Sequence, residues 1–351
     1  MHSTAQHSTA QRVVWVDVLR GIGIILVVLG HRIIYYIPHP LFDWIYVFHM
    51  PLFFFISGMF APKENNLEQQ NNNWLKKRIR TLVIPYIILG ILFVIANIVV
   101  YHVAHLPSPV SFRNYIEGIG IGPLWFLPTL FFVEFVYLSI KNVCTKERDL
   151  FVLVVLSAIL GCAINSFYMP KDPQSICYNF PYHINAVLIM LPFYYLGSVF
   201  YGKKELLFHF LKKWMLVLIV LGAFATSFIA SRINHQIDVN YGWYGNYLVF
   251  FAGAFSGIIV CIFTAMTIDH HLKTFSLVFS FFGKNTLVLL AFHTLFFKVV
   301  AGVFQLAGLA FLIYMPLFNT IFALICFIPV IFFFQKCFPI AVGKPQKHIQ
   351  Q

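Results

Sequence analysis

Charged residues are scarce in this sequence. Asp, Glu, Lys and Arg together make up 10% of its 351 residues, whereas soluble domains carry about a quarter. Hydrophobic residues account for 60% of the chain and aromatic residues for 18%. Because so few polar groups cannot cover a water-facing surface, the composition excludes a soluble domain and predicts a polytopic membrane protein.

Motifs of several other protein classes are also absent from the sequence. The six cysteines show no paired spacing, which argues against a disulfide framework or a zinc site. Neither a Walker-type loop nor a Gly-rich dinucleotide fingerprint occurs, so any nucleotide-bearing ligand must be held in another way. The chain shows no internal repeat of the kind expected in many secondary transporters.

Long apolar runs predict about ten membrane-spanning helices. They lie near residues 13–37, 42–61, 82–104, 124–141, 150–168, 185–201, 214–232, 244–266, 276–298 and 308–335. The predicted fold class is therefore all-α, a polytopic membrane helical bundle. It forms a single integral-membrane domain over residues 1–351, with short tails at 1–12 and 336–351.

The net charge of +12 reflects membrane topology rather than a nucleic-acid partner. If the N-terminus is cytoplasmic, 19 of the 24 Lys and Arg residues fall in inner segments. The remaining five are Arg32, Arg113, Lys171, Arg232 and Lys298. This bias follows the positive-inside rule, and it predicts cytoplasmic N- and C-termini in a multi-pass protein of the plasma (inner) membrane.

In the first predicted helix, Arg20 and His31 lie in a segment that is otherwise almost wholly apolar. A helix turns about 100° per residue, so residues eleven apart lie on nearly the same face, about 16 Å apart along the axis. Ionisable groups in a membrane usually face a bundle interior or a water-filled cavity. Asp17 stands three residues before Arg20, where the two can pair. That pair is either a local ion pair or a support that holds Arg20 toward an anionic ligand.

Three histidines lie about six residues from the outer ends of predicted helices: His31, His49 and His293. A single intramembrane histidine is often a hydrogen-bonded packing residue. Three at a similar depth favour a shared polar cavity, although depth alone does not make them neighbours. Imidazole suits proton transfer because its pKa lies near neutrality. The three lack the close spacings of common metal sites, so no metal is predicted.

Two further features carry charge into the predicted bundle. Glu134 lies well inside the fourth helix, where a carboxylate needs a partner, either an imidazole that it orients or a buried cation. The basic run Lys76 to Arg80 is typical of a topology anchor beside the cytoplasmic leaflet. The same side chains could also bind phosphates.

These features together resemble the membrane-bound acyltransferase-3 family. The first-helix signature, an Arg and a His with ten residues between them, is matched by Trp15-Val16-Asp17-Val18-Leu19-Arg20-Gly21 and Val28-Leu29-Gly30-His31. The second helix is matched by Phe48-His49-Met50-Pro51-Leu52-Phe53-Phe54-Phe55-Ile56-Ser57-Gly58. Later matches are Lys77-Arg78-Ile79-Arg80 with Pro85-Tyr86, Pro123-Leu124-Trp125-Phe126-Leu127, Pro192-Phe193-Tyr194-Tyr195-Leu196-Gly197, and Gly283-Lys284-Asn285-Thr286 with His293. The length is most similar to the short, fucose 4-O-acetylase-like members.

The resemblance implies an acyl-CoA-dependent O-acyltransferase. Such an enzyme moves an acyl group, usually acetyl from cytoplasmic acetyl-CoA, to a hydroxyl of an extracytoplasmic or lipid-linked glycan. The donor is a substrate, and the other expected partner is membrane lipid; no oligomeric state is predicted. The resemblance implies that His31 is the catalytic imidazole with Arg20 as its partner, that Glu134 and His293 belong to the site, and that Lys77, Arg78 and Arg80 lie near the CoA phosphates. With the residue patterns above, the candidate catalytic residues are His31, Arg20, Asp17, His49 and Glu134, and Trp125 and His293 are the candidate substrate contacts.

Several alternatives stay open. His31 acts either as a general base on the acceptor hydroxyl or as a nucleophile that forms an acyl-histidine. A succinyl donor is possible within the family and would require another outer cation, for which Lys298 and Arg232 are the candidates. The strongest rival class is a transporter or flippase of glycans or lipids, which would not depend on acyl-CoA.

Overall fold

The computed structural model describes residues 13–33, 39–62, 74–118, 122–168, 180–209 and 212–344. These residues are almost entirely helical, and the one β-type pairing among them is an isolated bridge between Asp238 and Trp243. Ten of the described helices are long and apolar enough to cross a membrane. The all-α polytopic bundle predicted from the sequence is therefore confirmed. The predicted tail at 1–12 lies outside the described residues, as do the last residues of the tail at 336–351.

The described helices follow one another along the chain in this order. They are α1 (Val14–Ile33), α2 (Pro40–Gly58), α4 (Ile84–Val103), α5 (Phe112–Glu117), α6 (Phe126–Val143), α7 (Glu147–Tyr168), α8 (Ile184–His209), α9 (Lys213–Ile233), α10 (Tyr247–His271), α11 (Lys273–Gly283), α12 (Thr286–Leu306) and α13 (Pro316–Cys337). A π-helical turn, η2 (Ile79–Val83), leads into α4. Shorter 3-10 turns are η3 (Gly122–Trp125), η4 (Pro181–His183), η5 (Ala310–Tyr314) and η6 (Pro339–Val342).

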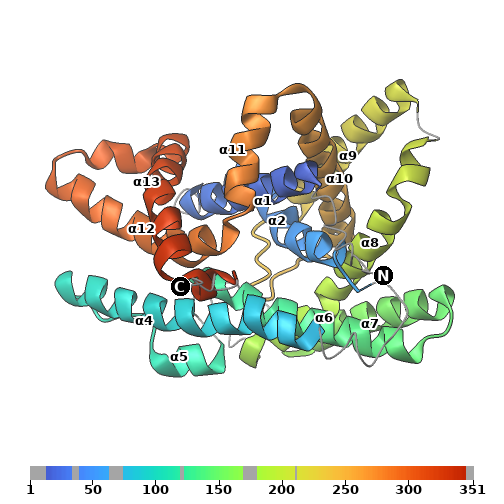
Figure 1. The fold of residues 1–351 in the computed structure, drawn as a ribbon, viewed down its shortest axis with the longest axis horizontal. Helices are drawn as coiled ribbons and strands as arrows, with labels where there is room; N and C mark the ends of the chain where they lie inside the picture. The colour runs from blue at the N-terminus through green and yellow to red at the C-terminus, as the bar shows by residue number, and fades with distance from the viewer. Residues whose placement is uncertain are drawn as a thin grey trace, which may run out of the picture.

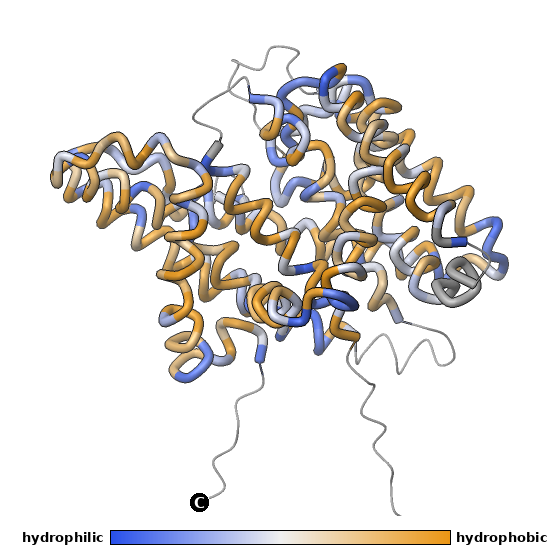
Figure 2. Tube along the Cα trace, turned by 90° about the horizontal axis from the view of Figure 1, so that it is seen from above, coloured by the Kyte–Doolittle hydropathy of each residue, from blue (hydrophilic) through white to orange (hydrophobic). Residues whose placement is uncertain are grey.

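The two helices that carry the family signature lie at the centre of the bundle. Figure 1 shows α4, α6 and α7 along one side, α11 to α13 on another and α8 to α10 on a third, with α1 and α2 between them. In the apolar stretch of α2 83% of residues are buried, against 22% in the peripheral α9. Figure 2 shows hydrophobic residues along the helices and hydrophilic residues gathered at the connecting turns. This is the distribution that a lipid-embedded bundle requires.

The ninth predicted span differs from the structure. Residues 276–298 do not form one helix, because the chain breaks at Lys284 and Asn285 into α11 and α12. α11 has 11 residues, too few to cross a bilayer, and it packs against α1. The tenth span was predicted over 308–335, but its helix α13 begins only at Pro316, because the 3-10 turn η5 occupies the preceding residues.

Two pairs of central helices approach so closely that their backbones touch at glycines. A Cβ on Gly21 of α1 would lie 2.0 Å from the carbonyl oxygen of Phe279 on α11, and a Cβ on Gly283 of α11 would lie 1.8 Å from the backbone of α1. α2 and α8 meet in the same way at Gly58 and Gly197. Small residues that admit close backbone approach are typical of helix contacts in membranes. Glycine at these positions therefore allows α1 to pack directly against α11, and α2 against α8, at the centre of the bundle.

Gly21→Ala is expected to lower the thermal unfolding midpoint by several degrees. The added Cβ must push α1 away from α11, and such overpacking costs about 1–3 kcal/mol or more. Gly222→Ala in α9 is the matched control, because outside its own helix backbone no atom lies within 4 Å of a Cβ there. Thermal unfolding of the purified proteins in detergent measures both, and equal midpoints for the two variants would contradict the close contact.

Candidate active site

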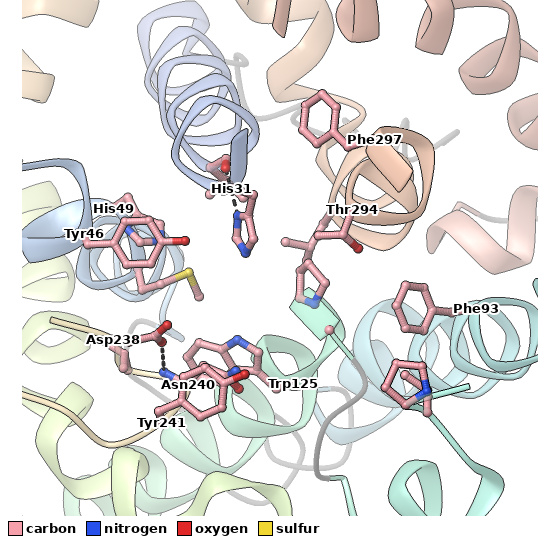
Figure 3. Close-up of a pocket in the computed structure, with 18 of the residues that line it drawn as sticks. His31, Tyr46, His49, Phe93, Trp125, Asp238, Asn240, Tyr241, Thr294 and Phe297 are labelled. Atoms are coloured by element: carbon pink, nitrogen blue, oxygen red, sulfur yellow. Dashed lines mark hydrogen bonds between the residues drawn. The ribbon is translucent and has the colours of Figure 1, made fainter. Parts of the chain in front are cut away.

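A cavity of about 400 Å³ lies between α1, α2, α4, α12 and the segment 234–246 that joins α9 to α10. We call it the histidine cavity (Figure 3). Its polar lining side chains are His31, Tyr46, His49, Asp238, Asn240, Tyr241, Thr294 and Lys298. Trp125, Phe93 and Phe297 add aromatic walls. A mostly apolar hollow with a few converging polar groups is the usual form of a small-molecule site.

His31 extends into the histidine cavity from the last turn of α1 (Figure 3). Its Nδ1 lies 2.9 Å from the carbonyl oxygen of Val27, one turn earlier. Because a carbonyl oxygen only accepts hydrogen bonds, Nδ1 donates, and the neutral ring carries its lone pair on Nε2. A lone pair oriented by a hydrogen bond on the far side of the ring is what a general base or a nucleophile needs.

The structure brings the three predicted histidines close together, but only His31 and His49 line the histidine cavity, whereas His293 is buried against His31. In His49 and His293, Nδ1 likewise lies 2.9 Å and 2.7 Å from the carbonyl oxygen four residues earlier. The rings of His31 and His293 meet edge to face, with centroids 4.8 Å apart, and Tyr46 lies beside both His31 and His49. The Nε2 of His293 is buried and has no hydrogen-bond partner among the described residues. Within that same part of the chain, no three metal-binding side chains are placed to hold an ion.

Trp125 forms one wall of the histidine cavity. It ends the 3-10 turn η3, directly before α6, and its ring lies 5.0 Å from the ring of His183. This position is compatible with the predicted contact to substrate, which stays a prediction.

Arg20 lies at the other end of α1, away from the histidine cavity. It lines a second pocket of about 140 Å³ together with Lys284, Lys344 and the first residues of α12; we call this the cationic pocket. The carboxylate of Asp17 lies 3.7 Å from the Arg20 guanidinium, so the expected ion pair is present. α12, like α1, borders both hollows. Two neighbouring helices therefore run from the cationic pocket to the histidine cavity.

Glu134 pairs with a cation of the basic run. Its Oε2 lies 2.5 Å from the Nε of Arg78, and the side chains are 0% and 15% exposed. Of the two uses that the sequence left open for Glu134, the structure shows the pairing with a buried cation. Lys77 and Arg80 are exposed, whereas Arg78 turns inward. Of the three predicted CoA-binding residues, Lys77 and Arg80 are thus exposed cations. Arg78 instead links the segment before η2 to α6.

The segment 234–246 supplies three polar lining residues that sequence reasoning missed: Asp238, Asn240 and Tyr241. The bridge between Asp238 and Trp243 closes a tight turn in this segment. The signal in the sequence is a short polar run between two apolar helices. Such a run predicts a connector, but only tertiary packing decides whether the connector turns outward or into the bundle.

Comparison with known families agrees with these observations. The chain matches the acyltransferase family Acyl_transf_3, described as an acyltransferase domain, over residues 13–336. Because this match spans nearly the whole chain, the protein belongs to that family and is a multi-pass membrane acyltransferase. The match does not identify the fucose 4-O-acetylase-like subgroup, which stays a prediction. No curated protein matches the chain at a significant level.

Glu134→Gln is expected to lower the free energy of unfolding by about 3–5 kcal/mol, because it leaves the buried Arg78 without a counter-charge. Glu117→Gln is the control: its carboxylate is also paired with an arginine, Arg113 at 2.9 Å, but the two side chains are 39% and 85% exposed. Pairs in water contribute little, so this variant should unfold like the wild type. Unfolding by SDS in mixed micelles compares the two, and equal losses would argue against a buried ion pair.

The pH dependence of stability should report on Asp238. Burial raises the pKa of its carboxyl group to about 7, although the N–H groups of Asn240 and Tyr241 partly offset the rise. In the unfolded chain the group loses its proton near pH 4, so its contribution to stability is complete below about pH 4 and is lost as the pH rises to about 7. Thermal midpoints between about pH 5 and 8 should therefore fall more steeply for the wild type than for Asp238→Asn. Exposed Asp149→Asn should keep the wild-type profile, and parallel curves for Asp238→Asn would contradict the buried carboxyl group.

Proposed function

We propose that the protein is an O-acetyltransferase that takes acetyl from acetyl-CoA at the cationic pocket and passes it to a hydroxyl of a glycan in the histidine cavity. The observation that carries the proposal is the oriented Nε2 lone pair of His31, on the same helix face as Arg20 and about 16 Å from it along the axis. A donor held at the Arg20 end and an acceptor held at the His31 end require a polar path between them, and this face of α1 would line it.

The cationic pocket suits the phosphates of the donor. Arg20, Lys284 and Lys344 surround the N-terminus of α12, where backbone N–H groups and the helix dipole also favour an anion. The backbone of Thr81, next to Arg80, lies against Gly343, next to Lys344. The exposed Lys77 and Arg80 thereby extend the positive surface beside the pocket. The thioester end of the donor would extend between α1 and α12 toward His31.

The chemistry at His31 follows from its tautomer. Nε2 accepts the proton of the acceptor hydroxyl while the hydroxyl oxygen attacks the thioester carbonyl carbon. The tetrahedral intermediate breaks its C–S bond, and the departing thiolate takes the proton back from the imidazolium. The hydrogen bond from Nδ1 to Val27 stabilises the imidazolium between these steps. In the alternative, Nε2 itself attacks the thioester carbonyl carbon, and the C–S bond breaks to release the CoA thiolate. The acyl-histidine then transfers the acetyl group to the acceptor hydroxyl, whose proton goes to the thiolate.

The membrane orientation follows from the same assignment. Acetyl-CoA is a cytoplasmic metabolite, so the end with Arg20, Lys77, Arg80 and Lys284 faces the cytoplasm, as the positive-inside rule also requires. The histidine cavity then opens on the outer side of the plasma membrane, where an extracytoplasmic or lipid-linked glycan is modified.

One observation favours a succinyl donor as the second candidate. Lys298 lines the histidine cavity, where its ammonium could pair with the free carboxylate of a succinyl group. The ammonium also lies 4.9 Å from the ring centroid of Tyr101. The other candidate cation, Arg232, is turned toward Asp43, 3.4 Å away. Acetyl stays the first choice because the same cation could equally contact the acceptor.

His31→Gln is expected to lower acyl transfer by at least about 100-fold, the usual contribution of a positioned general base. Transfer is measured with radiolabelled acetyl-CoA, in membranes that contain the protein and envelope glycans, as alkali-labile label in the glycan. The control is His270→Gln, an exposed histidine at the end of α10 that should leave transfer unchanged.

Equal labelling with wild type and His31→Gln would remove His31 from the mechanism. Label from succinyl-CoA but not from acetyl-CoA would favour the second candidate. Wild-type protein that is folded and labels glycan from neither donor would favour the transporter class.

A further inference from the structure

A rigid segment of the chain closes the side of the histidine cavity toward which His31 points. Figure 3 shows Asp238, Asn240 and Tyr241 there, across the cavity from α1. All three come from the segment 234–246, which belongs to none of the helices that carry the family signature. Residues placed opposite the reactive imidazole are positioned to hold the molecule that gives up its proton.

The segment is held in place by two helices and by hydrogen bonds within itself. The buried Asp43 of α2 accepts a hydrogen bond from the backbone N–H of Gln236 at 3.2 Å and contacts His235 at 3.0 Å. Asn165 of α7 donates to the carbonyl oxygen of Gly242 at 2.8 Å. Asn234 donates to two carbonyl oxygens farther along the segment, which closes it on itself. A binding surface fixed in this way loses little entropy when a ligand arrives.

The side chains of the segment suit a polyol. The Oδ1 of Asp238 accepts a hydrogen bond from the backbone N–H of Asn240 at 2.9 Å. A carboxylate can accept several more hydrogen bonds. Sugar hydroxyls are such donors, and the aromatic faces of Tyr241, Trp125 and Tyr46 in the same cavity can pack against the C–H face of a sugar ring. Acetyl-CoA does not suit this surface, because its phosphates are anionic and the carboxylate of Asp238 would repel them.

We propose that the segment 234–246 is the acceptor-binding element and that Asp238 accepts hydrogen bonds from the hydroxyl groups of the acceptor sugar. This inference rests on the proposed function and assigns its acceptor site. A carboxylate beside the acceptor favours a neutral sugar over an acidic one. The charged or titratable groups that face Asp238 across the cavity are His31 of α1, Tyr46 and His49 of α2, Lys298 of α12 and Tyr241 of its own segment.

The test compares wild type, Asp238→Asn and Asp149→Asn as purified proteins at about pH 8, where Asp238 is ionised. An Asn side chain still accepts the Asn240 N–H, so the turn is kept and only the charge is removed. Radiolabelled acetyl-CoA is the donor and an envelope glycan extract is the acceptor, and each is titrated in turn. Asp149 is an exposed carboxylate of α7, and its variant should match the wild type in both titrations.

Asp238→Asn should raise the half-saturating glycan concentration about tenfold or more, the effect of losing a charged hydrogen bond. The half-saturating acetyl-CoA concentration should rise far less. A purely structural role of Asp238 would weaken both substrates together, so equal shifts overturn the proposal, as does an unchanged glycan titration.

The failure of the proposed function has a separate signature. A wild-type protein that releases CoA thiol through His31 but transfers no label to glycan would keep the acyltransferase and overturn the acceptor site. A wild-type protein that consumes no acetyl-CoA would overturn both proposals.

Discussion

The backbone contact between α1 and α11 is the constraint on which the arrangement of this protein depends. With glycine at positions 21 and 283, the two helices approach until backbone meets backbone, and α1 then lies among α2, α10, α11, α12 and α13. In lipid, helices gain little by hiding apolar surface from one another, so close backbone packing of this kind determines which helix is central. Because α1 is central, Arg20 and His31 open into hollows inside the protein rather than into lipid.

The two hollows at the ends of α1 differ in the charged groups that line them. Arg20, Lys284 and Lys344 gather at one end of α1, while imidazoles, the carboxyl group of Asp238 and a single lysine, Lys298, line the cavity at the other. Away from both hollows, Arg78 and Glu134 neutralise each other inside the protein. Each of His31, His49 and His293 donates its Nδ1 proton to a carbonyl oxygen of its own helix, so this hydrogen bond needs no partner from elsewhere in the fold. This separation suits a reaction whose donor is anionic and whose acceptor is a neutral polyol.

Much of this could be predicted from residue patterns. The apolar runs predicted the ten long helices, and the eleven-residue spacing predicted that Arg20 and His31 share a face. The break between α11 and α12 was missed, because hydropathy averages over the polar pair Lys284 and Asn285. For Glu134 the sequence left two partners open, and the choice of Arg78 depends on how the π-helical turn before α4 lies against α6.

The sequence by itself determined the helices, their apolar faces and the depth of each ionisable group, because these follow from local periodicity and from the thickness of the bilayer. Only the tertiary structure decided which of those groups meet. His31 and His293 are neighbours although 262 positions separate them in the chain. Asp238 reaches the cavity because Asp43 and Asn165, from two other helices, hold its segment inward. Contacts between distant segments depend on the packing of whole helices, and no local pattern records that packing.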